Sequence, residues 1–344
     1  MSSGLLQAVG SLDVSQFWPT GRSDADTTKL ILYVAEDAIQ FKRDDQSPFV
    51  ATKVFNDAVV KGRGRNKAIR NGKLTIRLQG IDAPELHYRP AALSTSEKKG
   101  LTEKQIDAFR DLLHDYRQYY GATAAKALHD YLGGFGEKIP GRAVTRVDTP
   151  NEVFDTYGRF VGDIEIDDGA KVVNLNHWLV EQGWAFPTFY SSMSDAEIEA
   201  FIERAAKARG DKRGVWKLLS SKIKAFDFDL LEPEENDLDI LKDDKGPVLF
   251  PKLYRRQANW AARRKAKATR QSFQDYLATA SNGRPDSCFE TDDFLKNGVF
   301  SATPRGFDEF VKDGEKILFS PLELVFGEAQ STVLDADGNP IRAF

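Results

Sequence analysis

The sequence predicts an α+β fold in which strands and amphipathic helices follow one another along the chain. Residues 73–79 and 159–164 alternate between apolar and polar side chains, which is the period of a strand with one buried face. Residues 102–113 and 194–205 instead place apolar side chains three and four positions apart, the spacing of a helix that buries one side. Both kinds of element are therefore expected to build the core.

Other elements follow from local signals. Residues 28–34 are rich in β-branched and aromatic side chains, and residues 143–147 read as a further strand. A helix is expected over 121–131, ended by the glycine pair at 133–134. The Ser-x-x-Glu pattern at 194–197 is a capping box that predicts the start of the helix there.

The composition bounds the class of protein. The chain has 344 residues, 41% hydrophobic and 29% charged, which is typical of a globular protein with room for two domains. Its formal net charge of -4 does not predict a nucleic-acid-binding protein. Any contact with nucleic acid must therefore depend on local basic patches and not on the overall field.

Cysteine and histidine usage narrows the chemistry further. A single cysteine, Cys288, excludes an internal disulfide, and no disulfide-linked partner is expected. The four histidines lack the His-Glu-x-x-His spacing of zinc hydrolases. No apolar run reaches the roughly 18 residues of a membrane span, and residues 1–10 lack the features of a signal peptide. The chain is expected to be cytoplasmic unless a leader precedes it.

The most informative stretch is the strand at 73–79 and the turn that follows it. Arg77 projects from the polar face of the strand, and Pro84 stops the strand. The turn places Asp82 beside Glu85. Two carboxylates and a guanidinium at a strand end suit a hard cation together with a phosphate. A surface salt-bridge cluster is the alternative.

The sequence Arg-Leu-x-Gly-Ile-Asp-Ala-Pro-Glu at 77–85 closely resembles the signature of the staphylococcal nuclease (thermonuclease) family. The resemblance implies a five-stranded OB-type β-barrel with packed helices. It also implies a calcium-dependent nuclease that hydrolyses phosphodiester bonds of DNA, with RNA as a further candidate substrate, and leaves 3′-phosphates. The alternatives are a catalytically inactive nucleic-acid or protein binding module, and a scaffold that acts through charged C-terminal segments.

Two further motifs resemble the same family in the expected order. The tetrapeptide at 24–27 stands where relatives carry Asp-Gly-Asp-Thr, which would make Asp26 a calcium ligand. Ala25 replaces the glycine, and this requires a negative φ; a plain turn is the alternative. Tyr157-Gly-Arg159 resembles the second arginine motif of the family.

The resemblance assigns a role to each of these residues. Calcium would be held by Asp26, Asp82 and the backbone carbonyl of Ala83, a ligand that does not depend on the side chain. Glu85 would orient or deprotonate the attacking water, while Arg77 and Arg159 would hold the phosphate and stabilise the transition state. Contacts to the nucleotide are expected from the aromatic residues Tyr157, Phe189 and Tyr190, although the last two could equally close the barrel.

The resemblance covers residues 10–217, with insertions near 36–71 and 89–118. Residues 218–250 form an acidic segment interpreted as a linker, and 251–344 resemble no family that we recognise.

Two basic segments could contact a phosphate backbone. The loop at 61–67 lies within the first insertion, and the segment 252–270 carries eight arginines and lysines with Tyr254 and Trp260 between them. A solvated loop, and a helix neutralised by the preceding acidic segment, are the respective alternatives.

Overall fold

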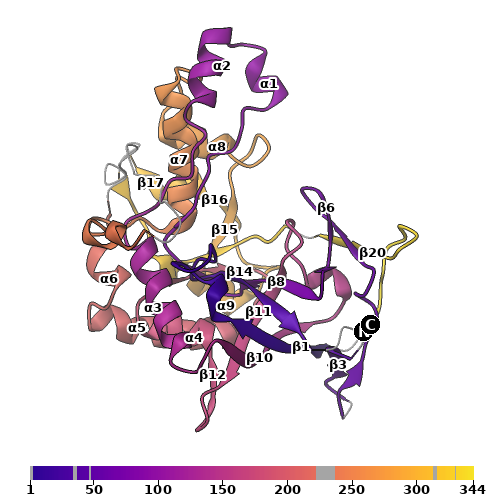
Figure 1. Ribbon diagram of the computed structural model, residues 1–344. Coiled ribbons are helices and arrows are strands. Elements are labelled where there is room, and N and C mark those ends of the chain that lie inside the picture. Colours follow the sequence, from indigo (N-terminus) through magenta and orange to yellow (C-terminus); the bar gives the residue numbers. More distant parts are fainter. Residues whose placement is uncertain (1–2, 34–36, 46–47, 222–236, 313–315, 330) are drawn as a thin grey trace. The chain divides into compact units, whose positions relative to one another are not determined.

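A computed structural model describes residues 3–33, 37–45, 48–221, 237–312, 316–329 and 331–344 (Figure 1). The chain divides into two compact units, and each is built from separated segments. The barrel unit comprises Met1–Gln79, Lys126–Leu179 and Glu328–Phe344. The helix-rich unit comprises Gly80–Ala125 and Val180–Gly327. The domain boundary expected at 217 stays a prediction, and residues 222–236 of the acidic segment lie outside the described residues.

The core of the barrel unit is a closed five-stranded barrel. Its strands, in order around the barrel, are β10 (Lys138–Val147), β11 (Phe160–Asp167), β8 (Lys73–Leu78), β2 (Thr27–Leu32) and β1 (Gly4–Asp13), and β1 pairs with β10 to complete the closure. Only the β8–β11 pair among these is parallel. The predicted OB-type α+β fold is confirmed.

The alternating sequence pattern builds the barrel interior. Leu74, Ile76 and Leu78 of β8 are all buried, whereas the residues between them are partly exposed. The alternate residues Phe160 and Ile164 of β11 are likewise buried. At Gly162 a Cβ atom would overlap the backbone of β10, so this close approach requires glycine.

The first insertion packs against the end of the chain. It contains β3 (Ile39–Arg43) and β4 (Val50–Ala51) on one edge of the barrel sheet, β7 (Ile69–Arg70) beside β8, and the pair β5 (Val59–Lys61) and β6 (Arg65–Lys67). Strand β20 (Thr332–Leu334) pairs with β5. The Phe344 ring stacks on Phe41 with centroids 4.1 Å apart. The insertion and the C-terminus therefore belong to one packed layer.

Two helices accompany the barrel, α3 (Gly121–Gly133) and α4 (Leu175–Glu181), and β12 (Val172–Asn174) precedes α4. The rings of Tyr131 and Trp178 stack between these helices at 4.1 Å. Asn176 donates to the backbone carbonyl of Gln79 at 2.9 Å and accepts from the Ile164 N–H at 3.2 Å. This buried amide fixes α4 to the barrel strands.

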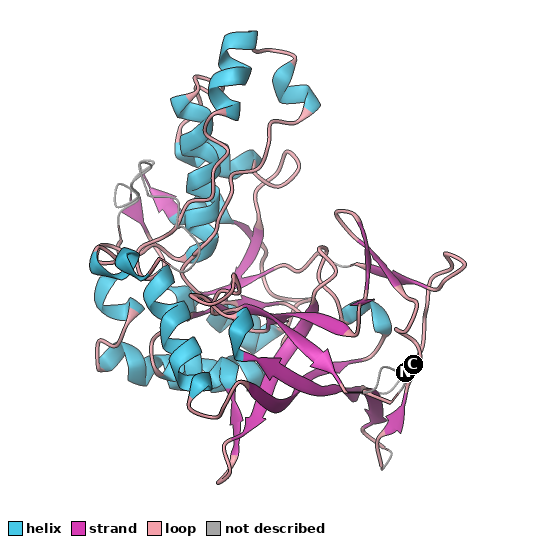
Figure 2. Ribbon diagram, in the orientation of Figure 1, coloured by secondary structure: helices cyan, strands magenta, loops and turns pink. Residues whose placement is uncertain are grey.

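The helix-rich unit contains most of the remaining helices (Figure 2). They are α1 (Thr95–Lys98), α2 (Glu103–Arg110), α5 (Asp195–Gly210), α6 (Val215–Leu218), α7 (Pro251–Lys265), α8 (Phe273–Thr279) and α9 (Thr291–Asn297). The predicted capping box of α5 is present, since Ser194 and Glu197 bond reciprocally.

Short strands complete this unit. β9 (Ile81–Asp82) pairs with β13 (Phe186–Pro187), and β17 (Val311–Lys312) pairs with β18 (Lys316–Ile317). A four-stranded sheet runs in the order β14 (Phe189–Tyr190), β19 (Leu324–Phe326), β15 (Ser287–Glu290) and β16 (Arg305–Gly306). Burial raises the pKa of the Cys288 thiol on β15 to about 12, so this cysteine is a core residue and not a reactive one.

The second insertion packs against α7. Leu93 and Phe109 form an apolar cluster with Ala262 and Ala266. The Asn259 side chain accepts from the backbone N–H of Ala91 at 2.7 Å. Residues 91–109 and helix α7, which are far apart in the sequence, are thus packing partners.

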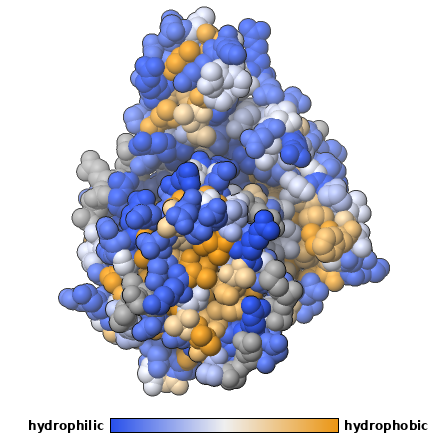
Figure 3. Space-filling model, turned by 90° about the vertical axis from the view of Figure 1, so that its right-hand side faces the viewer, coloured by the Kyte–Doolittle hydropathy of each residue, from blue (hydrophilic) through white to orange (hydrophobic). Residues whose placement is uncertain are grey.

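The surface mixes polar and apolar side chains, as the composition predicts. Hydrophilic side chains alternate with apolar patches on the face drawn in Figure 3. Among the described residues, no helix is long and apolar enough to cross a membrane.

Candidate active site

The barrel unit brings the first predicted metal ligand to the first predicted arginine. Thr27 lies opposite Arg77 in the register of β2 and β8, so Asp26 sits directly beside that arginine. The Arg77 guanidinium forms an ion pair with the Asp26 carboxylate, and the two side chains are only 13% and 8% exposed. Ala25 does not have a left-handed backbone, so alanine fits at this position. Strand pairing alone creates this contact.

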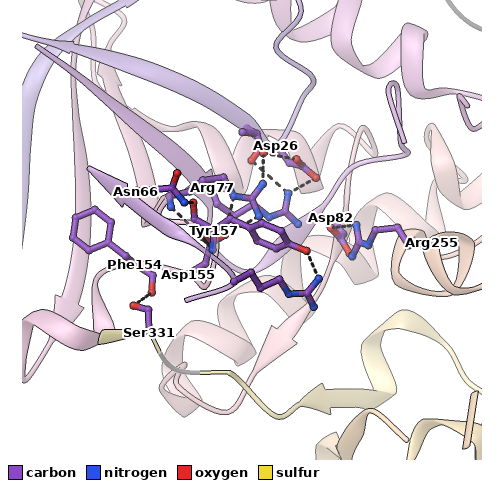
Figure 4. Close-up of polar contacts among 12 residues, drawn as sticks. Asp26, Asn66, Arg77, Asp82, Phe154, Asp155, Tyr157, Arg255 and Ser331 are labelled. Atoms are coloured by element: carbon purple, nitrogen blue, oxygen red, sulfur yellow. Dashed lines mark hydrogen bonds and ion pairs between the residues drawn. The ribbon is translucent and has the colours of Figure 1, made fainter. Parts of the chain in front are cut away.

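The second predicted arginine, Arg159, joins the same network, of which Asp26, Arg77 and Asp155 are labelled in Figure 4. Arg159 donates to the hydroxyl of Thr27 at 3.2 Å, and that hydroxyl donates to Asp26 at 3.1 Å. Arg159 Nε also donates to the Asp155 carboxylate at 2.7 Å. Gly158 has a φ of +82°, which lets the chain turn between Asp155 and Arg159. The two arginines, 82 positions apart in sequence (159 − 77), therefore share one hydrogen-bonded group.

The basic loop of the first insertion lies against this turn. The exposed Arg63 donates to the Tyr157 hydroxyl at 2.6 Å, and its guanidinium lies 4.9 Å from the Tyr157 ring centroid. Asn66 donates to the backbone carbonyl of Tyr157 at 3.0 Å. Tyr157 itself is 51% exposed, so its ring can reach solvent and a ligand.

The acidic turn after β8 belongs to the helix-rich unit. Asp82 ends β9, opposite Phe186 of β13, and is fully buried. Gln118 holds the turn, because its backbone N–H donates to the Glu85 carbonyl at 2.7 Å and its side chain accepts from the Glu85 N–H at 3.3 Å. The side chain of Glu85 is 13% exposed.

Both carboxylates of this turn contact Arg255 of α7. The guanidinium is bidentate toward Asp82, with Nη1 donating to Oδ1 at 3.1 Å and Nη2 to Oδ2 at 2.7 Å. Nη1 also donates to Glu85. Burial opposes the charge of Arg255, but the carboxylates of Asp82 and Glu85 raise its pKa well above the ordinary value. The labelled pair is visible in Figure 4.

Sequence reasoning did not identify Arg255 as a site residue. It placed Arg255 in a basic helix, and that helix is present as α7. Neutralisation by the preceding acidic segment stays the alternative interpretation, because residues 222–236 of that segment lie outside the described residues. Arg256 pairs with Asp286, and Arg263 pairs with Glu97. The interleaved basic and aromatic pattern was a signal for the helix but not for its partners.

The predicted calcium ligands have suitable donor atoms, but they make other contacts in the structure. Carboxylate oxygens are the ligands that Ca²⁺ prefers, so Asp26 and Asp82 fit the ion by type. Within the described part of the chain, no cluster of three or more Asp, Glu, His or Cys side chains is arranged to hold a metal. Both oxygens of Asp82 instead accept from Arg255. Ala83, whose carbonyl is the third predicted ligand, is buried.

The two remaining aromatic residues differ in exposure. Phe189 is fully buried on β14, which fits the alternative that this ring packs in a core. Tyr190 is partly exposed, and Lys252 Nζ lies 5.6 Å from its ring centroid. Burial lowers the pKa of this lysine to about 8. Contact of either ring with a nucleotide stays a prediction.

The closed five-stranded barrel, with an arginine and aspartate network at its strand ends, places this part of the chain in the class of OB-type barrel proteins. Residues 75–218 match the family model described as Staphylococcal nuclease homologue, and the chain therefore contains a domain of the staphylococcal nuclease family. The match includes Arg77, Asp82, Glu85 and Arg159 and leaves out Asp26 and Arg255. A comparison with curated proteins found no match.

Proposed function

We propose that this protein is a nuclease that hydrolyses phosphodiester bonds of DNA, with RNA as a further candidate substrate, and that leaves 3′-phosphates. The observation that carries the proposal is the network in which Arg77 and Arg159 converge on Asp26 and Thr27. Two guanidinium groups fixed side by side form a receptor for a phosphate group, since each presents several N–H donors in one plane.

The chemistry proposed for the site uses these residues in distinct roles. Arg77 and Arg159 would bind the phosphate oxygens and stabilise the charge that grows in the transition state. Glu85 would orient or deprotonate the attacking water. Calcium, when bound through Asp26, Asp82 and the Ala83 carbonyl, would add positive charge beside the phosphoryl oxygen.

The basic loop supports a polymeric substrate. Lys61, Arg63, Arg65 and Lys67 are all exposed, and Arg63 adjoins the Tyr157 ring. Exposed cations next to an exposed aromatic ring suit a nucleic-acid strand, in which phosphates alternate with bases that can stack. We propose that this loop contacts the substrate backbone next to the arginine network.

A second candidate function is a nucleic-acid binding module without catalysis. The contacts of Arg255 favour it, because they engage the carboxylates that the reaction would need. The arginine network and the basic loop would still bind phosphate in such a protein.

The decisive experiment is digestion of single-stranded DNA, double-stranded DNA and RNA with Ca²⁺, with Mg²⁺ and with a chelator. Glu85→Gln is assayed in parallel, and we expect this substitution to reduce cleavage strongly and to preserve nucleic-acid binding. Cleavage that requires Ca²⁺ and that Glu85→Gln abolishes supports the nuclease. Binding without cleavage under every condition would support the binding module instead, and near-normal turnover of Glu85→Gln would remove this residue from the mechanism.

A further inference from the structure

Arg255 occupies the position on Asp82 and Glu85 where the proposed reaction needs a metal ion and a free base. Its guanidinium takes both Asp82 oxygens and also contacts Glu85. The arginine comes from α7, which lies outside the residues that match the nuclease family. The contact is therefore a property of this chain and not of the shared domain.

We propose that Arg255 competes with a divalent cation for Asp82 and Glu85 and thereby sets the metal affinity of the site. This inference deepens the proposed function and rests on it for the identity of the cation, calcium. While Arg255 is in place, the Asp82 oxygens are engaged and the Glu85 carboxylate is committed to a guanidinium. Release of Arg255 removes this guanidinium contact from both groups together.

The competition follows from the burial of charge. Asp82 is fully buried, and a buried carboxylate is stable as an anion only when a cation lies beside it. Arg255 supplies a single positive charge that both carboxylates contact. A divalent ion would satisfy both carboxylates more fully, but it would repel a guanidinium at ion-pair distance. The two cations therefore exclude one another.

The backbone of α7 is fixed, so only the Arg255 side chain needs to move. Its immediate neighbour Arg256 is bidentate toward Asp286, with Nε 2.7 Å from Oδ2. One turn further along, Asn259 bonds Ala91 and Tyr88. The Arg255 side chain is 27% exposed and can rotate toward solvent. Displacement is a change of rotamer and not the departure of a helix.

The experiment measures calcium binding to the full-length protein by calorimetry for the wild type and for Arg255→Gln, Arg255→Lys and Arg256→Gln. Calcium binds only to those molecules in which Arg255 has left the carboxylates. The apparent calcium affinity is therefore the intrinsic affinity multiplied by the fraction of such molecules. If Arg255 blocks nine molecules in ten, Arg255→Gln binds calcium about tenfold more tightly. Arg255→Lys keeps the charge and falls between wild type and Arg255→Gln. Arg256→Gln, the matched control, leaves the affinity unchanged.

Thermal denaturation is a second measurement that remains informative if Arg255→Gln is too unstable for calorimetry. Arg255→Gln removes a cation from the buried Asp82 carboxylate, so it melts below the wild type in chelator and recovers in calcium. Equal calcium affinity in the wild type and Arg255→Gln, or a melting temperature of Arg255→Gln that calcium does not raise, overturns the proposal.

The readouts separate this inference from the proposed function. Tighter calcium binding by Arg255→Gln without cleavage of any nucleic acid would retain the competition and reject the nuclease. Cleavage by the wild type with unchanged calcium affinity in Arg255→Gln would retain the nuclease and reject the competition.

Discussion

The ion pairs of the barrel-unit arginine network and three ion pairs of the helix-rich unit join residues at different distances in sequence. In the barrel unit Arg159 pairs with Asp155, four positions away, and Arg77 with Asp26, 51 positions away across one strand pair. In the helix-rich unit the partners of Arg255 and Asp82 are 173 positions apart. Those of Arg263 and Glu97 are 166 apart, and those of Arg117 and Asp244 are 127 apart.

The difference shows what each unit depends on. The barrel pairs of Arg77 and Arg159 come from neighbouring strands and one turn, so they form when the barrel forms. The long-range pairs of the helix-rich unit instead join residues 89–118 to segments beyond residue 240. These two regions therefore stabilise one another through the described contacts, and we expect removal of either to disrupt the other.

The sharpest test of this dependence is Asp244→Ala. The Asp244 carboxylate is fully buried, lies 2.7 Å from Arg117, and also accepts from the backbone N–H groups of Tyr120 and Thr123. Its removal leaves a buried guanidinium without a counter-charge, and we expect a loss of about 3–5 kcal/mol in the free energy of unfolding. Urea denaturation followed by circular dichroism measures this loss.

Asp239→Ala is the control for Asp244→Ala. Asp239 pairs with Lys242, but both side chains are more than 70% exposed. Its loss should cost less than about 1 kcal/mol. Equal destabilisation by the two substitutions would contradict the structural role given to the long-range pair.

The next largest effect is expected in the barrel unit, from Arg77→Ala. If the arginine network binds the phosphate, turnover falls about 10²-fold or more. Arg142→Ala is the matched control, because Arg142 lies on the same barrel and pairs with Glu165 at 2.6 Å outside the network. It should leave turnover within about twofold of wild type. Comparable losses in the two variants would mean that any surface charge of the barrel affects the reaction through the general field.

The same contrast explains how much of the structure could be predicted. The barrel strands and the pairing of Arg77 with Asp26 could be predicted, because alternation marks each strand and adjacent strands bring their side chains together. The solvent exposure of single residues was harder to predict. Nothing in the sequence distinguishes the buried Phe189 from the partly exposed Tyr190 beside it.

The contact of Arg255 could not be predicted. Segment 252–270 offers eight cations, and helical periodicity indicates only that some of them face a partner. The choice of Arg255 for Asp82, and of Arg256 for Asp286, depends on how α7 packs against the second insertion. That packing is set by small apolar contacts at residues such as Ala262, which no local pattern identifies in advance.

The smallest predicted effect concerns Lys252, which precedes this arginine cluster on α7. Burial, together with Arg255 and Arg256, lowers the pKa of Lys252 from 10.5 to about 8, against the opposing influence of Asp286. Between these two values the unfolded chain retains a proton that the native protein has released. The free energy of unfolding of the wild type therefore rises with pH over this interval, relative to Lys252→Met, which cannot titrate.

Denaturation at about pH 7 and about pH 9.5 measures how the difference in the free energy of unfolding between the wild type and Lys252→Met changes with pH. Lys242→Met serves as the control, because the Lys242 side chain is 73% exposed. The difference between the wild type and Lys242→Met should therefore not change with pH. If the wild type and Lys252→Met respond to pH in parallel, Lys252 keeps an ordinary affinity for its proton. The positive charges on this face of α7 would then be better screened from one another than the long-range pairing of Arg255 and Arg256 implies.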